Sequence, residues 1–214
     1  MSSENISCGI DEAGRGPVIG PLVVTIVCGN NDALAGLGVK DSKKLSPIAR
    51  ERLYTEIMAH AEIIKTEIIT AAQLNLLMDT ENLNYIEQLS YVSLARMSPD
   101  ECTVYVDSFD VNPGRLGRLI ESETGRKVVS AHKADEVYPV VSAASIISKV
   151  IRDREVKAIE ERYGTMGSGY PSDPRTIKFI QESLKNGTDL SGIVRTKWKT
   201  YKTLVSRLTN SKLF

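Results

Sequence analysis

The chain has 214 residues, of which 42% are hydrophobic and 25% are charged, which is enough for a hydrophobic core in an ordinary globular protein. Lysine plus arginine equals aspartate plus glutamate at 27 each, so net charge alone gives no reason to expect a polyanionic partner. The sequence lacks the ~20 consecutive apolar residues of a membrane helix and the basic and apolar regions of a signal peptide. We therefore expect a protein that does not enter a membrane.

The first half of the chain predicts strands and helices that alternate. Strands are expected to end near Asp11 and to cover Leu22–Cys28 and Ile63–Ile69, because apolar and β-branched residues dominate these segments. Ser46-Pro47 is typical of a helix N-cap followed by proline, so a helix is expected from there to about His60. Helical structure is also expected over about Ala71–Met97.

The second half predicts two short strands and more helix. The strands are expected over Thr103–Asp107 and Lys127–Ser130. Asn112-Pro113 and Asp173-Pro174 each predict a helix start, and one long helix is expected from Asp135 to Tyr163. The last helix is expected to have one apolar face, formed by Val194, Trp198, Tyr201, Val205 and Leu208.

This order of elements predicts an α/β fold. Three early strands on short connections, followed by strand, helix and strand, favour a mixed five-stranded sheet flanked by helices. We expect a catalytic domain over residues 1–164 and a small helical C-terminal subdomain over residues 165–214 that contributes to substrate binding.

Four acidic residues stand at predicted strand ends. Asp11 and Glu12 close the first strand, Asp107 closes the fourth, and Asp135 begins the helix after the fifth. If the first and fourth strands are parallel neighbours, their carboxyl ends lie side by side. Like charges this close raise each other's pKa, and divalent cations with oxygen ligands such as Mg²⁺ remove the repulsion. Each acid also has a structural interpretation: Asp135 as a helix N-cap, for example, and Asp107 as a turn residue.

The C-terminal tail is basic. No acidic residue follows Asp189, whereas six bases do: Arg195, Lys197, Lys199, Lys202, Arg207 and Lys212. Such a distribution suits a protein that binds a polyanion, and Lys197, Lys199 and Lys202 are candidate substrate contacts. The alternative is a helix face that is merely solvated.

Three cysteines, Cys8, Cys28 and Cys102, lie in apolar strand-like segments without the paired spacing of a zinc site. We expect buried, reduced thiols in a cytoplasmic protein and no disulfide.

Six motifs resemble those of the ribonuclease HII family and occur in the family's order from residue 9 to about residue 175. They are Gly9-Ile10-Asp11-Glu12-Ala13-Gly14-Arg15-Gly16-Pro17, Lys40-Asp41-Ser42-Lys43-Lys44-Leu45, Val106-Asp107-Ser108, His132-Lys133-Ala134-Asp135, Ser142-Ala143-Ala144-Ser145-Ile146 and Gly169-Tyr170-Pro171-Ser172-Asp173. The resemblance implies a ribonuclease H fold and cleavage of the RNA strand of RNA/DNA hybrids on the 5′ side of a ribonucleotide, including single ribonucleotides within duplex DNA.

The same resemblance implies roles for individual residues. Asp11, Glu12, Asp107 and Asp135 would be the catalytic ligands of Mg²⁺ or Mn²⁺, with two ions during catalysis. Gly14, Arg15 and Gly16 would read the ribose 2′-OH, the group that distinguishes RNA from DNA. Tyr170 would lie under the sugar on the DNA side of an RNA–DNA junction. Lys43 and Lys44 are candidate phosphate contacts, although solvation alone also accounts for lysines in a polar loop.

The expected partner is an RNA/DNA hybrid or duplex DNA that contains ribonucleotides. A sliding clamp is a further candidate partner for the tail, and a monomer is expected. Two rival functions are a DNA junction nuclease of the same fold, which would cut all-DNA substrates, and a non-catalytic hybrid-binding protein. The four acids argue against the second, because a binder of polyanions gains nothing from negative charge in its groove.

Overall fold

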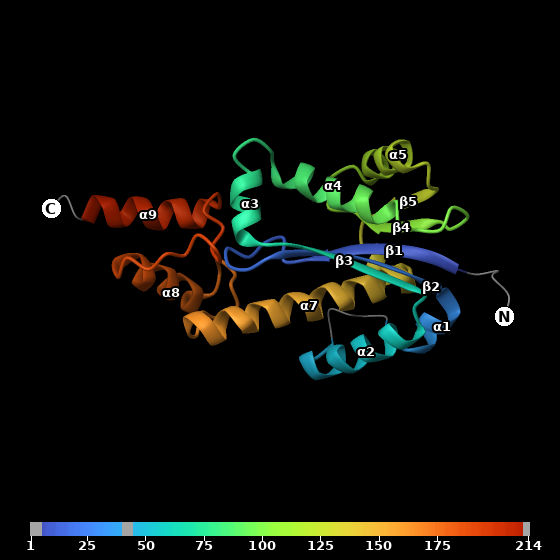
Figure 1. Ribbon diagram of the computed structural model, residues 1–214, viewed down its shortest axis with the longest axis horizontal. Coiled ribbons are helices and arrows are strands. Elements are labelled where there is room, and N and C mark those ends of the chain that lie inside the picture. Colours follow the sequence, from blue (N-terminus) through green and yellow to red (C-terminus); the bar gives the residue numbers. More distant parts are fainter. Residues whose placement is uncertain (1–5, 40–44, 212–214) are drawn as a thin grey trace. The chain divides into compact units, whose positions relative to one another are not determined.

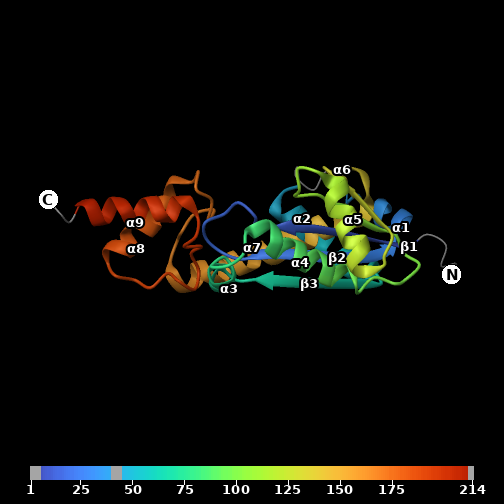
Figure 2. The same cartoon turned by 90° about the horizontal axis from the view of Figure 1, so that it is seen from above.

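The structure, a computed structural model, describes residues 6–39 and 45–211. Its centre is a five-stranded sheet of order β3-β2-β1-β4-β5. The strands are β1 Ile6–Ala13, β2 Leu22–Asn30, β3 Ile63–Ile69, β4 Val104–Asp107 and β5 Val128–Ala131. β1 is antiparallel to β2 and parallel to β4, and β4 is parallel to β5, so the predicted mixed sheet is confirmed. Figure 2 shows β3 at the edge of this sheet.

Nine helices surround or follow the sheet in the described part of the chain. They are α1 Asn31–Gly36, α2 Pro47–His60, α3 Ala71–Leu77, α4 Leu83–Ala95, α5 Pro113–Thr124, α6 Ala134–Val137, α7 Pro139–Tyr163, α8 Pro174–Lys185 and α9 Lys199–Ser211. The predicted caps are present: the side chains of Ser46, Asn112 and Asp173 accept hydrogen bonds from backbone N–H groups in the first turns of α2, α5 and α8.

The described residues group into two compact units, one drawn from Met1–Ala13, Val23–Glu67 and Asn84–Ile151, the other from Gly14–Leu22, Ile68–Leu83 and Arg152–Phe214. In the first unit, α1, α2 and the first half of α7 cover one face of the sheet, and α4 and α5 cover the other (Figure 1). Buried aliphatic side chains of α7, β2, α1 and α2 form one core cluster. These two units change at Ile151–Arg152 and not at residue 164. The domain boundary predicted at residue 164 stays a prediction.

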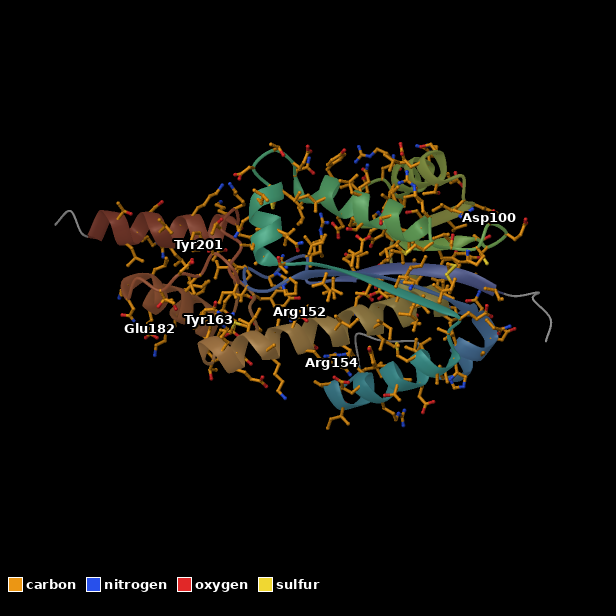
Figure 3. All side chains as sticks on the ribbon, in the orientation of Figure 1. Asp100, Arg152, Arg154, Tyr163, Glu182 and Tyr201 are labelled. Carbon is orange, nitrogen blue, oxygen red and sulfur yellow. A yellow bond between two sulfur atoms is a disulfide. The ribbon has the colours of Figure 1, made fainter. Side chains whose placement is uncertain are left out.

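The second unit has its own core, which includes Ile19, Met166, Ile180 and Val194. Tyr163 at the end of α7 and Tyr201 on α9 pack against this cluster (Figure 3), and α8 lies beside α9 (Figure 2). A single antiparallel bridge between Ile19 and Val194 joins the segment after β1 to the segment before α9.

Three expectations about helices need correction, and one helix was not predicted. The long helix predicted from Asp135 is divided at Tyr138 into α6 and α7, because Pro139 has no backbone N–H and takes the first position of a new helix. The helical region after Ala71 is likewise two helices, α3 and α4. The final helix begins only at Lys199, so Val194 and Trp198 precede it, and Val205 is exposed. The short helix α1 was not predicted.

The expectation of reduced cysteines is wrong for two of the three. Cys8 of β1 and Cys28 of β2 are directly paired in the antiparallel register with their Cα atoms 4.0 Å apart, and their sulfur atoms form a disulfide. The sequence shows no hint of this pairing, because only the register brings two residues 20 positions apart face to face. Cys102 is a free, buried thiol as predicted.

No helix among the residues described is long and apolar enough to cross a membrane.

Gly9 on β1 provides a test of the sheet–helix packing. A Cβ atom at this position would lie 2.3 Å from the backbone carbon of Val140 and 2.4 Å from the nitrogen of Val141, both on α7. We expect Gly9→Ala to lower the free energy of unfolding by about 3 kcal/mol, as severe overpacking does. Urea denaturation measures this change. Gly36→Ala is the matched control: its Cβ would meet nothing within 4 Å, so its stability should stay close to that of the wild type. Equal stability of both variants would contradict the described contact between β1 and α7.

Candidate active site

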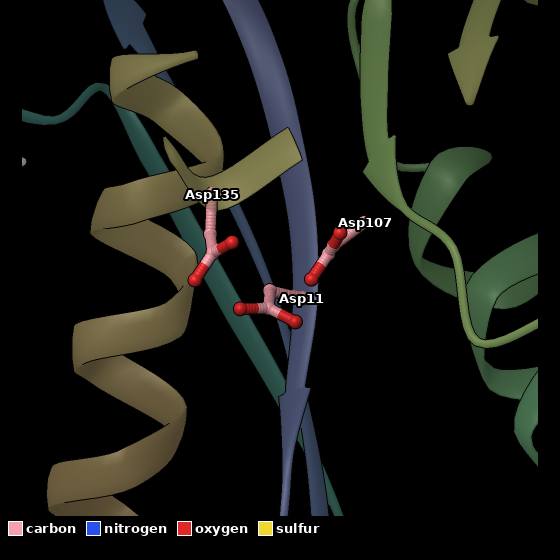
Figure 4. A group of neighbouring side chains, drawn as sticks. All are labelled: Asp11, Asp107 and Asp135. Atoms are coloured by element: carbon pink, nitrogen blue, oxygen red, sulfur yellow. The ribbon is translucent and has the colours of Figure 1, made fainter. Parts of the chain in front are cut away.

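Three aspartates meet in the first unit. Asp11 comes from β1, Asp107 from the end of β4 and Asp135 from the first turn of α6. One carboxylate oxygen of each lies within 4.8 Å of the others, and the three side chains point toward a common centre (Figure 4). Asp11 and Asp135 are only 5% and 4% exposed, so this is a dehydrated cluster rather than a set of surface acids.

The parallel register explains how two of these acids meet. Ile10 of β1 pairs with Val106 of β4, so Asp11 and Asp107 each follow directly after paired residues. The carboxyl ends of the two strands therefore lie at the same edge, as the sequence predicts for parallel neighbours.

Hydrogen bonds hold the segment that carries the third acid, Asp135. The Asp107 carboxylate accepts from the Ala134 N–H at 2.9 Å, which joins the end of β4 to the start of α6, one residue before Asp135. The hydroxyl of Ser142 on α7 donates to the Asp135 carbonyl. Lys133, just before α6, has φ +57° and is the one non-glycine residue with a left-handed backbone among those described. Such a conformation costs about 1–2 kcal/mol, and it is retained where the surroundings require it.

Two side chains of α7 face Asp11. Burial raises the pKa of the Asp11 carboxyl well above its usual range, and the negative charges of Glu12 and Asp107 raise it further. A hydrogen bond from Ser145 and the charge of Lys149 oppose this rise. The Lys149 ammonium donates to the Ser145 hydroxyl at 2.6 Å, so the two form one connected polar group beside Asp11. Ser148, one turn away, donates to the Asp11 carbonyl at 3.1 Å.

Glu12 does not belong to the group of three. Successive side chains of a strand point to opposite faces, and Asp11 faces α7 whereas the Glu12 carboxylate accepts a hydrogen bond from the hydroxyl of Tyr91 on α4. The same hydroxyl also lies 3.3 Å from the Asp107 carbonyl. Glu12 is thus held beside the cluster from the other side of the sheet, and its role as a metal ligand stays a prediction. Nothing in the sequence singles out Tyr91, because an aromatic residue on an apolar helix face usually belongs to the hydrophobic core.

This donor set fits a hard divalent cation. All three groups offer carboxylate oxygens, the ligands that Mg²⁺ and Mn²⁺ prefer, and no cysteine or histidine belongs to the described cluster. The raised pKa of Asp11 shows that the metal-free cluster is electrostatically unfavourable when it is ionised. Positive charge placed among the three oxygens would reverse this effect.

The predicted substrate loop lies in the second unit. Gly14 has φ +90°, and a Cβ there would lie 2.4 Å from the Pro21 carbonyl oxygen, so only glycine fits. A Cβ at Gly16 would lie 3.4 Å from the ring of Tyr170. Gly16 and Tyr170, which are 154 positions apart by their residue numbers, are therefore neighbours.

The loop around Tyr170 is rigidly held, although the tyrosine itself is 41% exposed. Its neighbour Gly169 donates to the Thr176 hydroxyl at 3.0 Å and accepts from the Val18 N–H at 2.8 Å. The Arg152 guanidinium (Figure 3) lies 5.6 Å from the centre of the Tyr170 ring and also donates to the Ser168 carbonyl at 3.1 Å. The ring is thus presented by a loop that is anchored on both sides.

The predicted lysines differ in their surroundings. Lys199 and Lys202 are exposed on α9, whereas Lys197 forms an ion pair with Asp79. All three line an open hollow of about 510 Å³ together with Thr203, Ser206 and Arg207. Lys43 and Lys44 lie outside the described residues.

Comparison with known proteins identifies the family. The sequence model of the ribonuclease HII family matches residues 8–201. The chain belongs to the ribonuclease HII family. A ribonuclease HII of Thermoplasma volcanium is 50% identical over 199 residues, 93% of this chain and 92% of that protein. The chain is therefore a ribonuclease H-type endoribonuclease, a phosphodiester hydrolase.

Solved structures of ribonuclease HII relatives agree with the fold. Ribonuclease H2 of Pyrococcus horikoshii superposes with a TM-score of 0.89 at 39% identity, covering 95% of this chain and 99% of that one. A structure of the complex between PCNA and RNase HII from Archaeoglobus fulgidus matches with a TM-score of 0.85 at 46% identity, covering 91% of this chain and 95% of that one. The predicted ribonuclease H-like fold is confirmed.

The raised pKa of Asp11 predicts how stability depends on pH without metal. An acid whose pKa is higher in the folded state stabilises the fold below its unfolded-state pKa, and this stability is lost as the pH rises through the folded-state value. With EDTA present, the wild type should lose stability from about pH 4 upward, and Asp11→Asn should lose less. At pH 8 without metal, the variant should be more stable than the wild type by about 1–3 kcal/mol. In a separate assay with metal, its cleavage activity should be largely abolished. Asp32→Asn, on the exposed face of α1, serves as the control in urea denaturation across this range. Parallel curves for wild type and Asp11→Asn would contradict the electrostatic account.

Proposed function

We propose that this enzyme cleaves the RNA strand of RNA/DNA hybrids on the 5′ side of ribonucleotides, including single ribonucleotides embedded in duplex DNA. The convergence of three aspartate carboxylates within 4.8 Å carries the hydrolytic part of the proposal. The chemistry needs no nucleophilic side chain, because water attacks the phosphodiester bond. The membership of the ribonuclease HII family supports the choice of substrate.

Asp11, Asp107 and Asp135 would hold the divalent cations, with Glu12 as the proposed fourth ligand. When bound, two Mg²⁺ or Mn²⁺ ions would supply Lewis-acid stabilisation of the attacking and leaving oxygens. The protein's own contribution is to hold the carboxylates close together and fixed in place, and to limit the rise in the pKa of Asp11. Ser145 and Lys149 favour the ionised form of Asp11. Hydrogen bonds to the Asp107 carboxylate and the Asp135 carbonyl hold the chain segments that carry the other two acids.

The second unit would supply substrate recognition. Gly14, Arg15 and Gly16 would contact the ribose through backbone groups, since a 2′-OH can both donate and accept. Tyr170, in contact with the Gly16 position, would pack against the sugar of the next, DNA-type nucleotide. The adjacency of Gly16 and Tyr170 supports reading of an RNA-to-DNA step. Residues 165–214 would contribute Tyr170 and the lysines of the tail.

We also propose further contacts with the substrate duplex and one further partner. Lys197, Lys199 and Lys202 would contact the phosphate backbone of the duplex, and Lys43 and Lys44 are proposed as further phosphate contacts. The relative from Archaeoglobus fulgidus was solved in complex with PCNA, which supports a sliding clamp as a partner of this enzyme as well. We propose that the enzyme acts as a monomer in the cytoplasm.

A cleavage assay tests this function directly. The substrate is a duplex with one embedded ribonucleotide, incubated with Mg²⁺ or Mn²⁺, and the cut position is mapped at nucleotide resolution. We expect one cut on the 5′ side of the ribonucleotide, loss of cleavage with EDTA and no cleavage of the all-DNA duplex. Cleavage of an all-DNA junction would instead favour the rival nuclease function, and binding without cleavage would favour the hybrid-binding protein.

The tail lysines should determine the salt dependence of binding. Changing Lys197, Lys199 and Lys202 together to Gln should weaken hybrid binding and flatten the plot of log affinity against log salt by roughly 0.7–0.9 for each phosphate that the variant no longer neutralises. Because Lys197 is paired with Asp79, Lys202→Gln alone should flatten it more than Lys197→Gln alone. Lys185→Gln, an exposed lysine on α8, is the control. An unchanged slope in the triple variant would mean that these lysines form only a solvated face.

Tyr170 should discriminate between substrates. Tyr170→Ala is expected to lose about tenfold to a hundredfold more activity on a single embedded ribonucleotide than on a continuous hybrid, since aromatic contacts with nucleotides are worth ~1–3 kcal/mol. Single-turnover rates on both substrates measure this difference. Tyr85→Ala provides the control, because Tyr85 is also 41% exposed but lies on α4. Equal losses on both substrates would show that Tyr170 only supports its loop.

A further inference from the structure

Arg195 does not belong with the surface bases of the tail. It stands between the bridge residue Val194 and α9, and it is the largest fully buried side chain among the described residues, with 0% exposure. The sequence groups it with the exposed lysines that follow, but the structure places it inside the second unit. A buried guanidinium needs an explanation, because arginine is almost never buried without a partner.

The partners of Arg195 are backbone carbonyls of one loop. Its Nη2 donates to the Gly14 oxygen at 2.6 Å, its Nη1 to the Arg15 oxygen at 3.2 Å and its Nε to the Gly20 oxygen at 2.9 Å. Its own backbone N–H donates to the Val18 carbonyl at 2.8 Å. The ring of Trp198 lies 4.8 Å from its guanidinium carbon. Arg195 thus holds the whole turn between β1 and β2 from inside.

A role for Arg195 that is limited to filling space in the core does not account for its burial and its three hydrogen bonds. Among the described residues no carboxylate pairs with Arg195, and burial followed by the nearby charge of Arg152 lowers the pKa of its guanidinium to about 9. An apolar side chain of similar size would avoid this unfavourable burial. Only a planar group with several N–H donors, however, can bind three carbonyls in fixed directions at once.

The three carbonyls also fix the opposite side of the loop. A trans peptide unit is planar, and its N–H points away from its C=O. With the Gly14 and Arg15 carbonyls turned toward Arg195, the N–H groups of Arg15 and Gly16 must point away from it. These N–H groups belong to the predicted ribose-reading residues, next to Tyr170.

We propose that Arg195 is a positioning residue for substrate selectivity: it orients the peptide units of Gly14 and Arg15 so that the Arg15 and Gly16 N–H groups meet the ribose of the substrate. This inference rests on the proposed function, in which the glycine loop reads the 2′-OH. Arg195 itself touches no substrate, and it acts only through the loop.

The test compares the binding of two duplexes that differ by one 2′-OH. One duplex carries a single ribonucleotide, the other is all DNA, and both affinities are measured with EDTA present so that cleavage does not interfere. Arg195→Lys keeps the charge but removes the planar set of donors. We expect this variant to bind the ribonucleotide duplex about tenfold more weakly, the factor that corresponds to a net loss of one hydrogen bond, and to bind the all-DNA duplex as tightly as the wild type.

The matched control is Arg162→Lys, an exposed arginine that also lies over an aromatic ring, 5.3 Å from the centre of Tyr163. It should bind both duplexes like the wild type. If folded Arg195→Lys keeps the full preference for the ribonucleotide duplex, Arg195 is only a core residue and the proposal fails. If the wild type neither prefers the ribonucleotide duplex in binding nor cleaves it in the assay with metal, the proposed function and the proposal both fail. If the wild type cleaves at the ribonucleotide but Arg195→Lys keeps the wild-type binding preference, only the proposal about Arg195 fails.

A second measurement needs no variant and covers the case in which Arg195→Lys does not fold. Amide hydrogen exchange of the wild type is recorded with each duplex bound. The amides of Arg15 and Gly16 should exchange more slowly with the ribonucleotide duplex than with the all-DNA duplex. Equal exchange rates would show that these N–H groups do not meet the ribose, which would overturn the proposal while leaving the cleavage reaction in place.

Discussion

The first unit holds several carboxylates close together in a dehydrated site. Their mutual repulsion is the main constraint on the fold around them. Asp11 is buried beside Asp107 and Asp135, and its pKa is raised by that burial and by its charged neighbours. Such a cluster costs stability in the metal-free protein, so the surrounding fold must offset the cost. The packed sheet and α7 provide this offset, and bound cations would turn the same repulsion into affinity for metal.

The backbone around the cluster shows how the position of each acid is maintained. Asp107 binds the N–H that precedes Asp135, Ser148 of α7 binds the carbonyl of Asp11, and Lys133 keeps a left-handed conformation. Glu12 is held from the opposite face through Tyr91. The cluster is therefore supported from both faces of the sheet.

The second unit also contains a buried charge, in this case a positive one. Arg195 is buried without a carboxylate, and its hydrogen bonds to three carbonyls determine the shape of the loop at Gly14 and Arg15. In both units an unfavourable buried charge is kept where it fixes the groups that are proposed to act on substrate. Replacing buried charges with well-packed apolar residues is often neutral or stabilising, so stability alone does not account for these two charges.

The sequence by itself determined the strands, most helix starts, the three aspartates that meet and the family, because strand periodicity, caps such as Ser46 and short motifs are local properties of the chain. The apolar pattern did not predict the break before Pro139, whose missing N–H ends the preceding helix, or the start of the last helix at Lys199, because the pattern continues across both positions. Only the tertiary structure paired Cys8 with Cys28, turned Glu12 toward Tyr91 and placed Arg195 inside the second unit. Each of these depends on strand register or on contacts between residues far apart in sequence, and neither is encoded in local residue patterns.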